Sequence, residues 1–541
     1  MMLKLKLCIL ISFIGMHFSF AQDIELRWSA QLDAKKTGYP AGVVGKDETG
    51  FYLIKVKSSD LYLEKFDTNM QLLWTKNLVV FVAKNKKADY EDIIISENKI
   101  VLFSSFYDNK TKTKKLFASH ISKEGILDPK LAEINSFEGL KSKSSVGYDV
   151  ELSKNKKTIL VFSDFRERGE ENEKFHYKVI DENFLQKAQS FVELPYIGSN
   201  VSILDYIIDD ASNIHAIYSV NLKKEEEGNK ANDDKIDFNY YIMSYYPATK
   251  EYKEYDMRVG EYVISGMSLI IDDESRFMYV PGYYADKNVN ALRGTMISKI
   301  DLINKSIVYA KKKEFDAAFL AEVYAKPVDD DDDKKKAAKA IDEDKNDGKK
   351  AKGKEQLYNY DIRDLFVNDK GEVVLISEQY YVRVVTTTST SSSGVTTTRT
   401  TYYYYYMNVM AIKFDIQGER VWSTNIPKYQ VTVNDGGFYS SVGVFDHNDN
   451  VYLFYNDNPK NGTTMAAKQY STKSPAKSQL ALITIDTNGK ATKRVLMPAP
   501  EEGKGIATQP KFCVQLDEKE NEILILGYIS SDYKLGKIHI K

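Results

Sequence analysis

The sequence predicts an all-β protein, a single β-propeller of about eight four-stranded blades closed into a ring by its N-terminal strand. Three observations support this prediction: a polar turn that recurs between apolar strands, a second repeated motif at the end of a third strand, and an unmatched strand at each end of the chain. The composition agrees, because 38 Tyr and 25 Phe against only 12 Pro favour strands over helices.

The first repeated feature is a short polar turn between runs of strand length that are rich in Val, Ile, Leu and aromatic residues. Each turn opens with Asp, Ser or Asn, whose side chains hydrogen-bond nearby backbone amides and so initiate turns. This pattern is typical of a β-hairpin. The turns open at Asp47, Ser96, Ser153, Asp209, Asp272, Asn368, Asp446 and Asp517. One blade per turn gives eight blades, with seven or nine as alternatives.

The second repeated feature ends the third strand of a unit, and a fourth strand follows it. In the clearest units the fourth strand carries a tryptophan, Trp74 or Trp422. The remaining tryptophan, Trp28, has the same context but no strands before it, whereas the last unit stops after its third strand. We therefore expect strand Leu26–Leu32 to complete the last blade, which leaves only short, protected sheet edges. An open β-solenoid or two stacked sandwiches are the alternative architectures.

One form of the repeat carries a resemblance to known proteins. The pattern D-x-x-G-x-x-x-W from Asp415 to Trp422, with a looser copy from Asp67 to Trp74, resembles the blade repeats of secreted bacterial β-propeller proteins of the quinoprotein-like and YVTN-like group. The resemblance covers most of the chain and implies the fold but no activity, because propellers host many unrelated functions. Quinone-cofactor propellers typically carry an adjacent cysteine pair, which this chain lacks.

The N-terminal segment 1–21 is interpreted as a secretory signal peptide. Lys4 and Lys6 precede an apolar stretch from Leu7 to Phe20, and cleavage is expected after Ala21. Residues 22–541 then form the propeller in the periplasm or outside the cell. An anchor helix is the alternative, but the apolar run is shorter than the ~20 residues that span a bilayer, so we expect no membrane span in the mature form.

Three low-complexity insertions interrupt the repeat, at residues 223–237, 326–356 and 384–401. The first two are highly charged, and the second should be disordered. The third lies within the Thr-, Ser- and Tyr-rich stretch from Tyr380 to Tyr406 and predicts a long hairpin extending the second and third strands of the sixth blade. Such a hairpin could add a strand to a partner protein, or it could be a tolerated surface insertion.

The sequence contains few signs of catalysis or of cofactor binding. The histidines are widely spaced, with no zinc-binding spacing, and no G-x-S-x-G nucleophile motif occurs. The 75 basic and 77 acidic side chains form no basic stripe, which argues against nucleic acid as a partner. We expect no cofactor. Calcium was considered at residues 329–333 and at Asp446, Asn448 and Asn450, where a solvated charge run and an ordinary turn are the simpler explanations.

Candidate site residues emerge when the units are aligned. Four residues before the turn opener, where we expect the first strand to begin, four units carry an aspartate: Asp92, Asp149, Asp205 and Asp364. The first strand of a blade is usually innermost, so these side chains would form an acidic arc near one channel mouth and bind a cation or basic ligand. Alternatively, each aspartate caps backbone of the neighbouring blade. The glycine-containing segment Asn434–Ser441 is a second candidate near the channel mouth.

The sequence thus favours a non-catalytic exported β-propeller that acts as a binding or scaffold module for an envelope or extracellular protein, a peptide or a glycan. Tyrosines suit such interfaces because they combine apolar area with a polar tip. A polysaccharide-active hydrolase or lyase at the channel mouth is the alternative, since glycosidase chemistry needs only two carboxylates. A purely structural envelope component is a third possibility.

Overall fold

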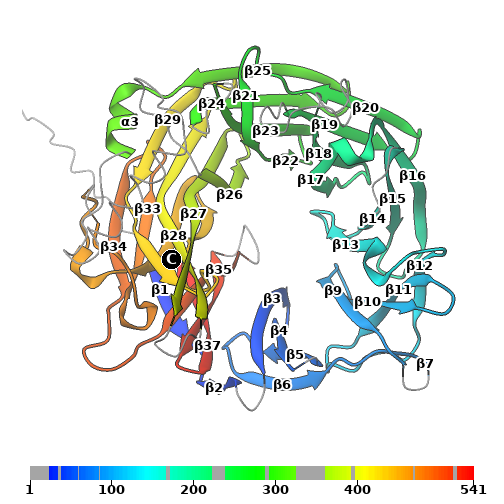
Figure 1. Ribbon diagram of the computed structural model, residues 1–541, viewed down its shortest axis with the longest axis horizontal. Helices are drawn as coiled ribbons and strands as arrows, with labels where there is room; N and C mark the ends of the chain where they lie inside the picture. The colour runs from blue at the N-terminus through cyan, green and yellow to red at the C-terminus, as the bar shows by residue number, and fades with distance from the viewer. Residues whose placement is uncertain are drawn as a thin grey trace, which may run out of the picture.

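The computed structural model describes most of the chain after the N-terminal segment (Figure 1). The described residues are 24–34, 38–58, 60–83, 86–165, 171–221, 238–286, 292–323, 360–390, 396–466, 469–515 and 521–540. The expected signal peptide and the insertions at 223–237 and 326–356 therefore lie outside the described residues.

Eight antiparallel sheets surround one axis as the blades of a β-propeller, which confirms the predicted fold class and blade number (Figure 1). In blades 1 to 7 the strands follow one another from the ring centre outwards. Blade 1 contains β3 (Tyr39–Asp47), β4 (Gly50–Lys57), β5 (Asp60–Phe66) and β6 (Leu72–Asn77). Blade 2 contains β9 (Asp89–Ile95), β10 (Ile100–Asp108), β11 (Thr113–Ile121) and β12 (Ala132–Phe137). Blade 3 contains β13 (Val146–Leu152), β14 (Ile159–Phe165), β15 (Asn172–Ile180) and β16 (Gln186–Ile197).

The next four blades repeat this arrangement, and two of them have a divided or an additional strand. Blade 4 contains β17 (Val201–Ile208), β18 (Ile214–Asn221), β19 (Phe238–Tyr246) and β20 (Glu251–Asp256). Blade 5 contains β21 (Val263–Met267), β22 (Ile270–Asp272), β23 (Phe277–Ala285), β24 (Leu292–Asp301) and β25 (Ser306–Glu314). Blade 6 contains β26 (Tyr360–Val367), β27 (Val373–Thr390), β28 (Thr396–Phe414), β29 (Arg420–Ile426) and β30 (Gln430–Val433). Blade 7 contains β31 (Gly443–His447), β32 (Asn450–Asp457), β33 (Gln479–Ile485) and β34 (Ala491–Met497).

Both ends of the chain meet in blade 8, as the unmatched strands predicted. Its order is β35, β36, β37 and β1, so the first strand in the sequence is the outermost strand of the last sheet. The expected strand Leu26–Leu32 is displaced, because the chain leaves the edge of β37 after Trp28 and pairs with it again over a short second segment. The elements are β35 (Ala507–Gln515), β36 (Glu522–Ile529), β37 (Asp532–Ile540), β1 (Ile24–Trp28) and β2 (Leu32–Asp33).

A buried ion pair within blade 1 is hydrogen-bonded to a tyrosine of blade 8 where the ring closes. The Lys55 Nζ atom lies 2.8 Å from Glu64 Oε1 and 2.9 Å from the hydroxyl of Tyr533 in β37. The Tyr533 hydroxyl also donates a hydrogen bond to the Glu64 carboxylate. All three side chains are buried, so each polar group is compensated across the seam.

Two small elements complete the described structure. β7 (Phe81–Ala83) and β8 (Lys86–Lys87) form a hairpin in the connection between blades 1 and 2. The helix α3 (Ala317–Val323) follows blade 5 and buries Phe319 and Val323 against blade 6. Among the described residues, no helix combines the length and apolarity that a membrane span requires.

Candidate functional site

The four aspartates singled out from the sequence lie on the innermost strands of four blades: Asp92 on β9, Asp149 on β13, Asp205 on β17 and Asp364 on β26 (Figure 1). One part of the expectation was wrong. Each strand begins three or four residues before its aspartate, so the aspartates lie within the strands. The inner wall of the ring, away from the strand ends, is therefore the candidate site.

Three of these aspartates follow a β-bulge. The pairing of the inner strand with its neighbour skips Glu91, Leu204 and Arg363, each directly before a candidate aspartate. A bulge disrupts the hydrogen-bond ladder and leaves backbone groups unpaired. In all three blades the aspartate Oδ1 atom accepts a hydrogen bond from the next backbone amide, at 2.7, 2.9 and 2.8 Å. Three of the four aspartates thus stabilise a bulge in their own strand. This structural role replaces the alternative expected from the sequence, in which each aspartate caps backbone groups of the neighbouring blade.

Asp149 differs from the other three, because β13 pairs with β14 without a bulge. Glu151 follows two residues later on the same strand and therefore points to the same side of the sheet. Glu151 keeps an exposed surface, but the surrounding inner strands partly desolvate its carboxyl and raise its pKa to about 7, and the charges of Asp205, Asp92 and Asp149 add to this rise. The structure thus groups four carboxylates on β9, β13 and β17.

The other candidate aspartates also have raised pKa values. Burial raises the pKa of Asp92 to about 6, with a contribution from Asp149, and burial also raises the pKa of Asp205. Burial raises the pKa of Asp364 to about 6 as well, but the acidic neighbour there is Asp446 of blade 7. Asp364 is therefore electrostatically separate from the other three aspartates, and the predicted single arc divides into two parts.

A cavity of about 530 Å³ connects the two parts, with Asp205 on one side and Asp364 on the other. It lies between the inner strands of blades 4, 5 and 6, and its wall includes Ser268, Asp361 and Arg363. Its volume lies within the ~300–1,000 Å³ range of small-molecule sites. The structure thus brings Asp205 and Asp364 to one cavity, whereas Asp92 and Asp149 do not line it.

Arg363 links this cavity to a buried cluster at the base of the long hairpin. Its Nε atom donates a hydrogen bond to Glu378 Oε2 on β27 at 2.9 Å. Glu378 also forms a fully buried ion pair with Lys428, with a distance of 2.7 Å between Nζ and Oε1, and it accepts a hydrogen bond from Ser441. Burial lowers the pKa of Lys428. The cluster fixes β27 and the segment after β29 in one arrangement.

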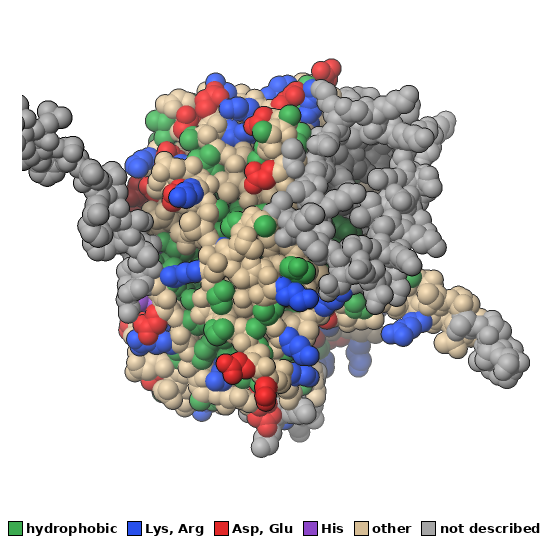
Figure 2. All heavy atoms as spheres, turned by 90° about the vertical axis from the view of Figure 1, so that its left-hand side faces the viewer, with side chains coloured by type: hydrophobic (Ala, Val, Ile, Leu, Met, Phe, Trp, Pro, Cys, Tyr) green, Lys and Arg blue, Asp and Glu red, His purple; other side chains and the backbone are tan. Residues whose placement is uncertain are grey.

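The predicted hairpin is present and extends the second and third strands of blade 6. β27 and β28 stay paired up to Thr390 and Thr396, whereas β26 pairs with β27 only as far as Gln379. Within the described residues, no strand covers the other edge of β27 from Tyr380 to Thr390. The hairpin is the rod that projects from the body at the lower right of Figure 2.

One face of this hairpin exposes apolar side chains near its base. Val384 is directly opposite Tyr402, and Val382 lies two residues earlier on the same face. Their exposed fractions are 54%, 43% and 39%, which is high for residues of this kind. Further out the surface is made of threonines, so the base of the hairpin offers an apolar contact area and the outer part a polar one.

The segment Asn434–Ser441 has a structural explanation. Gly436 and Gly437 both adopt a φ of +67°, which favours glycine. A side chain on Gly437 would also collide with the ring of Tyr406, since the nearest ring atoms would lie 2.5 Å from its Cβ atom. The two glycines therefore allow this loop to pack on the base of the hairpin.

The calcium candidate at residues 329–333 lies outside the described residues, whereas the one at Asp446, Asn448 and Asn450 lies in an ordinary turn. Asn448 and Asp449 form the two-residue connection between β31 and β32, with φ of +50° and +60°. A Ser–His–Asp series is present, in which Ser244 and Asp209 contact opposite nitrogens of His215, but all three residues are fully buried and no substrate could reach them. Among the described residues, no group of three His, Cys, Asp or Glu side chains is arranged to hold a metal ion.

These features define the class of protein, a β-propeller, and comparisons add no narrower family. No family model and no curated protein matches the chain. Solved structures that resemble it include an uncharacterized protein from Listeria monocytogenes EGD-e, which is 13% identical, with a TM-score of 0.32 and coverage of 93% of this chain and 92% of that one. A Synechocystis apocarotenoid oxygenase mutant is 8% identical, with a TM-score of 0.31 and 70% coverage of both chains.

A GH43 endo-arabinanase from Bacillus licheniformis is 10% identical, with a TM-score of 0.23, and the match covers 54% of this chain and 98% of that one. Similarities this low carry no argument about activity. The assignment to the β-propeller class rests on the eight sheets and on the closure of the ring by β1.

Proposed function

We propose that this β-propeller is a non-catalytic binding module that holds a partner protein at its projecting hairpin. The open edge of β27 from Tyr380 to Thr390 carries this proposal. An edge strand presents unpaired N–H and C=O groups to which an extended segment of another chain can add as a further strand. The edge contains no proline, and no described strand pairs with it.

The charges of the hairpin favour an acidic partner. Between Tyr380 and Thr390, and between Thr396 and Tyr402, the only charged side chains are Arg383 and Arg399. The chain as a whole has a formal net charge of −2, so the hairpin differs in sign from the rest of the molecule. An extended segment with Asp or Glu residues would pair with these arginines, and the exposed Val384 and Tyr402 would cover its apolar side chains.

The proposal places the protein in the periplasm or outside the cell. The basic and apolar N-terminal segment supports export, because it has the order of a signal peptide. The partner would then be a protein of the cell envelope or the extracellular space. The rigid ring below the hairpin suits this role, because loops and extensions on a fixed scaffold commonly carry binding.

A crosslinked pull-down from envelope extract tests the proposal. We compare the mature wild-type protein with two separate hairpin variants, one lacking Thr386–Thr401 and one carrying Arg383→Glu. A fourth protein, Lys490→Glu, is the control, because Lys490 is an exposed cation in a turn of blade 7. The proposal expects a defined acidic protein to be captured by the wild type and the control, and to be lost with both hairpin variants. Capture that is the same for all four proteins would refute the hairpin as the binding element.

The cavity between blades 4, 5 and 6 supports a second candidate function, a polysaccharide hydrolase or lyase. Asp205 and Asp364 line it together, and a carboxyl with a pKa of about 6 could act as a general acid near neutral pH. Release of reducing ends from envelope polysaccharides, abolished by Asp364→Asn, would support an enzyme. Binding of polysaccharide without turnover would support a binding module.

A further inference from the structure

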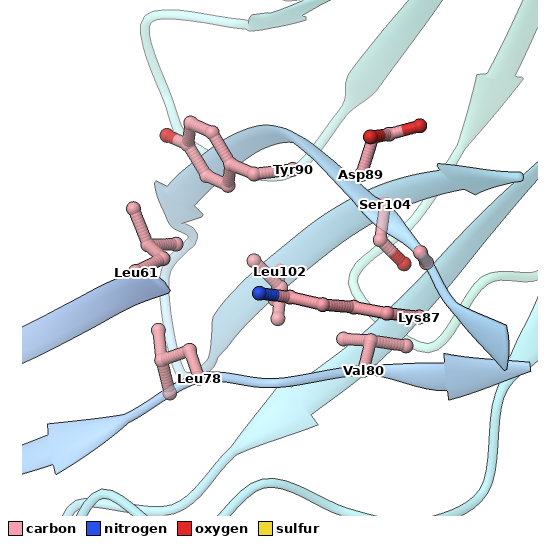
Figure 3. A pocket seen from close by; sticks show the side chains of 9 residues that line it. Leu61, Leu78, Val80, Lys87, Asp89, Tyr90, Leu102 and Ser104 are labelled. Carbon is pink, nitrogen blue, oxygen red and sulfur yellow. The ribbon is translucent and has the colours of Figure 1, made fainter. Parts of the chain in front are cut away.

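A second, smaller cavity lies at the seam between blades 1 and 2, far from the hairpin in the sequence (Figure 3). Its volume is about 220 Å³. Its walls are aliphatic side chains from β5, from β10 and from the connection between the two blades. These side chains are Leu61, Leu78, Val80, Ala88 and Leu102, and each of them is at least 91% buried. The cavity thus has an apolar floor between the blades and a rim of the partly exposed residues Lys87, Asp89 and Tyr90.

Buried aliphatic side chains that line an open pocket are left without packing partners on one side, and an apolar ligand can supply these contacts. Two backbone hydrogen bonds fix the connection that carries β7 and β8 and so keep the cavity open. The Leu78 amide donates to the Leu61 carbonyl, and the Ala88 amide donates to the Val80 carbonyl. The volume is several times the ~30 Å³ of a water molecule, yet below the ~300 Å³ of typical drug-sized sites. A small organic molecule fits this space.

Two polar groups reach into the apolar cavity (Figure 3). The Ser104 side chain on β10 is 97% buried, and its hydroxyl points into the cavity. A hydroxyl in this position can donate a hydrogen bond to an oxygen atom of a ligand that fills the cavity. The Lys87 side chain crosses the cavity from β8, so that its ammonium group lies over the aliphatic wall.

The charges around the cavity select the sign of the ligand. The Lys87 Nζ atom is held by Asp60 at 2.6 Å, but both side chains are partly exposed, and such a surface ion pair contributes little free energy. A ligand carboxylate can therefore share or replace Asp60. Asp89, the acidic residue on the rim, turns away from the cavity and is paired with Lys143 at 2.8 Å.

We propose that this cavity binds a small aliphatic carboxylate, with its hydrocarbon chain between Leu61, Leu78 and Leu102 and its carboxylate at the Lys87 ammonium and the Ser104 hydroxyl. An amine of the same length would meet the Lys87 charge with its own positive charge. A pure hydrocarbon would offer no hydrogen-bond acceptor to the Lys87 ammonium or the Ser104 hydroxyl. This inference is independent of the hairpin and of the partner protein proposed above.

Titration of the full mature protein with hexanoate, followed by ligand-observed NMR, tests the proposal. We expect saturable binding of hexanoate and weaker or no binding of hexylamine. Lys87→Gln should weaken hexanoate binding by about tenfold, as expected for the loss of a charge-assisted hydrogen bond. Lys86→Gln is the matched control, because Lys86 lies next to it on β8, is paired with Asp108 and does not line the cavity.

Filling the cavity provides a second variant. Ala88→Leu places additional aliphatic groups in the empty space, so it should abolish binding while the melting temperature stays at or above that of the wild type. The proposal is overturned if the wild type does not bind hexanoate, if hexylamine binds as tightly, or if Lys86→Gln and Lys87→Gln have equal effects. Binding that Ala88→Leu leaves unchanged would place the ligand elsewhere and overturn it as well.

Discussion

Replacing Glu151 by Gln is expected to stabilise the folded protein above neutral pH and to have no electrostatic effect in acid. The pKa of Glu151 rises from 4.5 to about 7 because of burial and the charges of Asp205, Asp92 and Asp149. A carboxyl whose pKa is raised by folding lowers the stability as pH rises through the interval between the unfolded and folded values. The isosteric amide removes this cost.

The rise in pKa sets the magnitude of the effect. At 1.36 kcal/mol per pKa unit, a shift of this size corresponds to roughly 3 kcal/mol as an upper bound. The Glu151 side chain is exposed to solvent at the ring centre, so screening reduces this value, and we expect about 1 kcal/mol. The wild type should lose this amount as pH rises from 4.5 to about 7, whereas Glu151→Gln should keep it.

Urea unfolding of both proteins at about pH 5 and about pH 8 measures this difference. The account expects similar midpoints at the lower pH and a higher midpoint for Glu151→Gln at the higher pH. Equal midpoints at both values would show that folding does not raise the pKa of Glu151, and this would contradict the account. A variant that is less stable at the higher pH would show that the ionised Glu151 has a stabilising partner, and the reasoning would be refuted.

Three further predictions concern the fold. Deleting Ile24–Trp28 removes the outermost strand of blade 8 and exposes the edge of β37. The variant should therefore melt at a lower temperature and associate through this edge, which light scattering detects. A monomer with an unchanged melting temperature would contradict the closure of the ring by β1. Lys428→Met removes the fully buried cation of Glu378 and leaves Arg363 as its other positive partner, so it should cost about 3 kcal/mol in urea unfolding. A loss below about 1 kcal/mol would contradict this. Removing Thr386–Thr401 should leave the melting temperature unchanged, because these residues extend beyond the blade.

Much of the fold could be predicted from the sequence because each blade carries local signals. Six of the eight turn openers lie in or next to the connection between the first and second strands of a blade, Asp446 lies one residue before the end of β31, and Asp517 lies outside the described residues. Trp28, Trp74 and Trp422 all lie on outermost strands. The hairpin could be predicted for the same reason, since Thr, Val and Tyr around a central glycine favour two paired strands.

The site was harder to predict because it depends on contacts between blades. The bulges at Glu91, Leu204 and Arg363 shift the pairing by one residue and have no clear sequence signal, so the structural role of the following aspartates was missed. Glu151 was also missed, although its place two residues after Asp149 is a signal that strand periodicity offers. The cavity at Ser104 depends on how two blades pack together, which no repeat within one blade reveals.

The most direct test of the central claim is photocrosslinking in intact source cells from a single position on the hairpin. A photoreactive amino acid replaces Val384, and a control protein carries it at Val421, an equally exposed valine on β29 of the same blade. The account predicts one discrete crosslinked protein from position 384 and none from position 421. The same products from both positions, or no product from position 384, would contradict the claim that this propeller binds its partner through the hairpin.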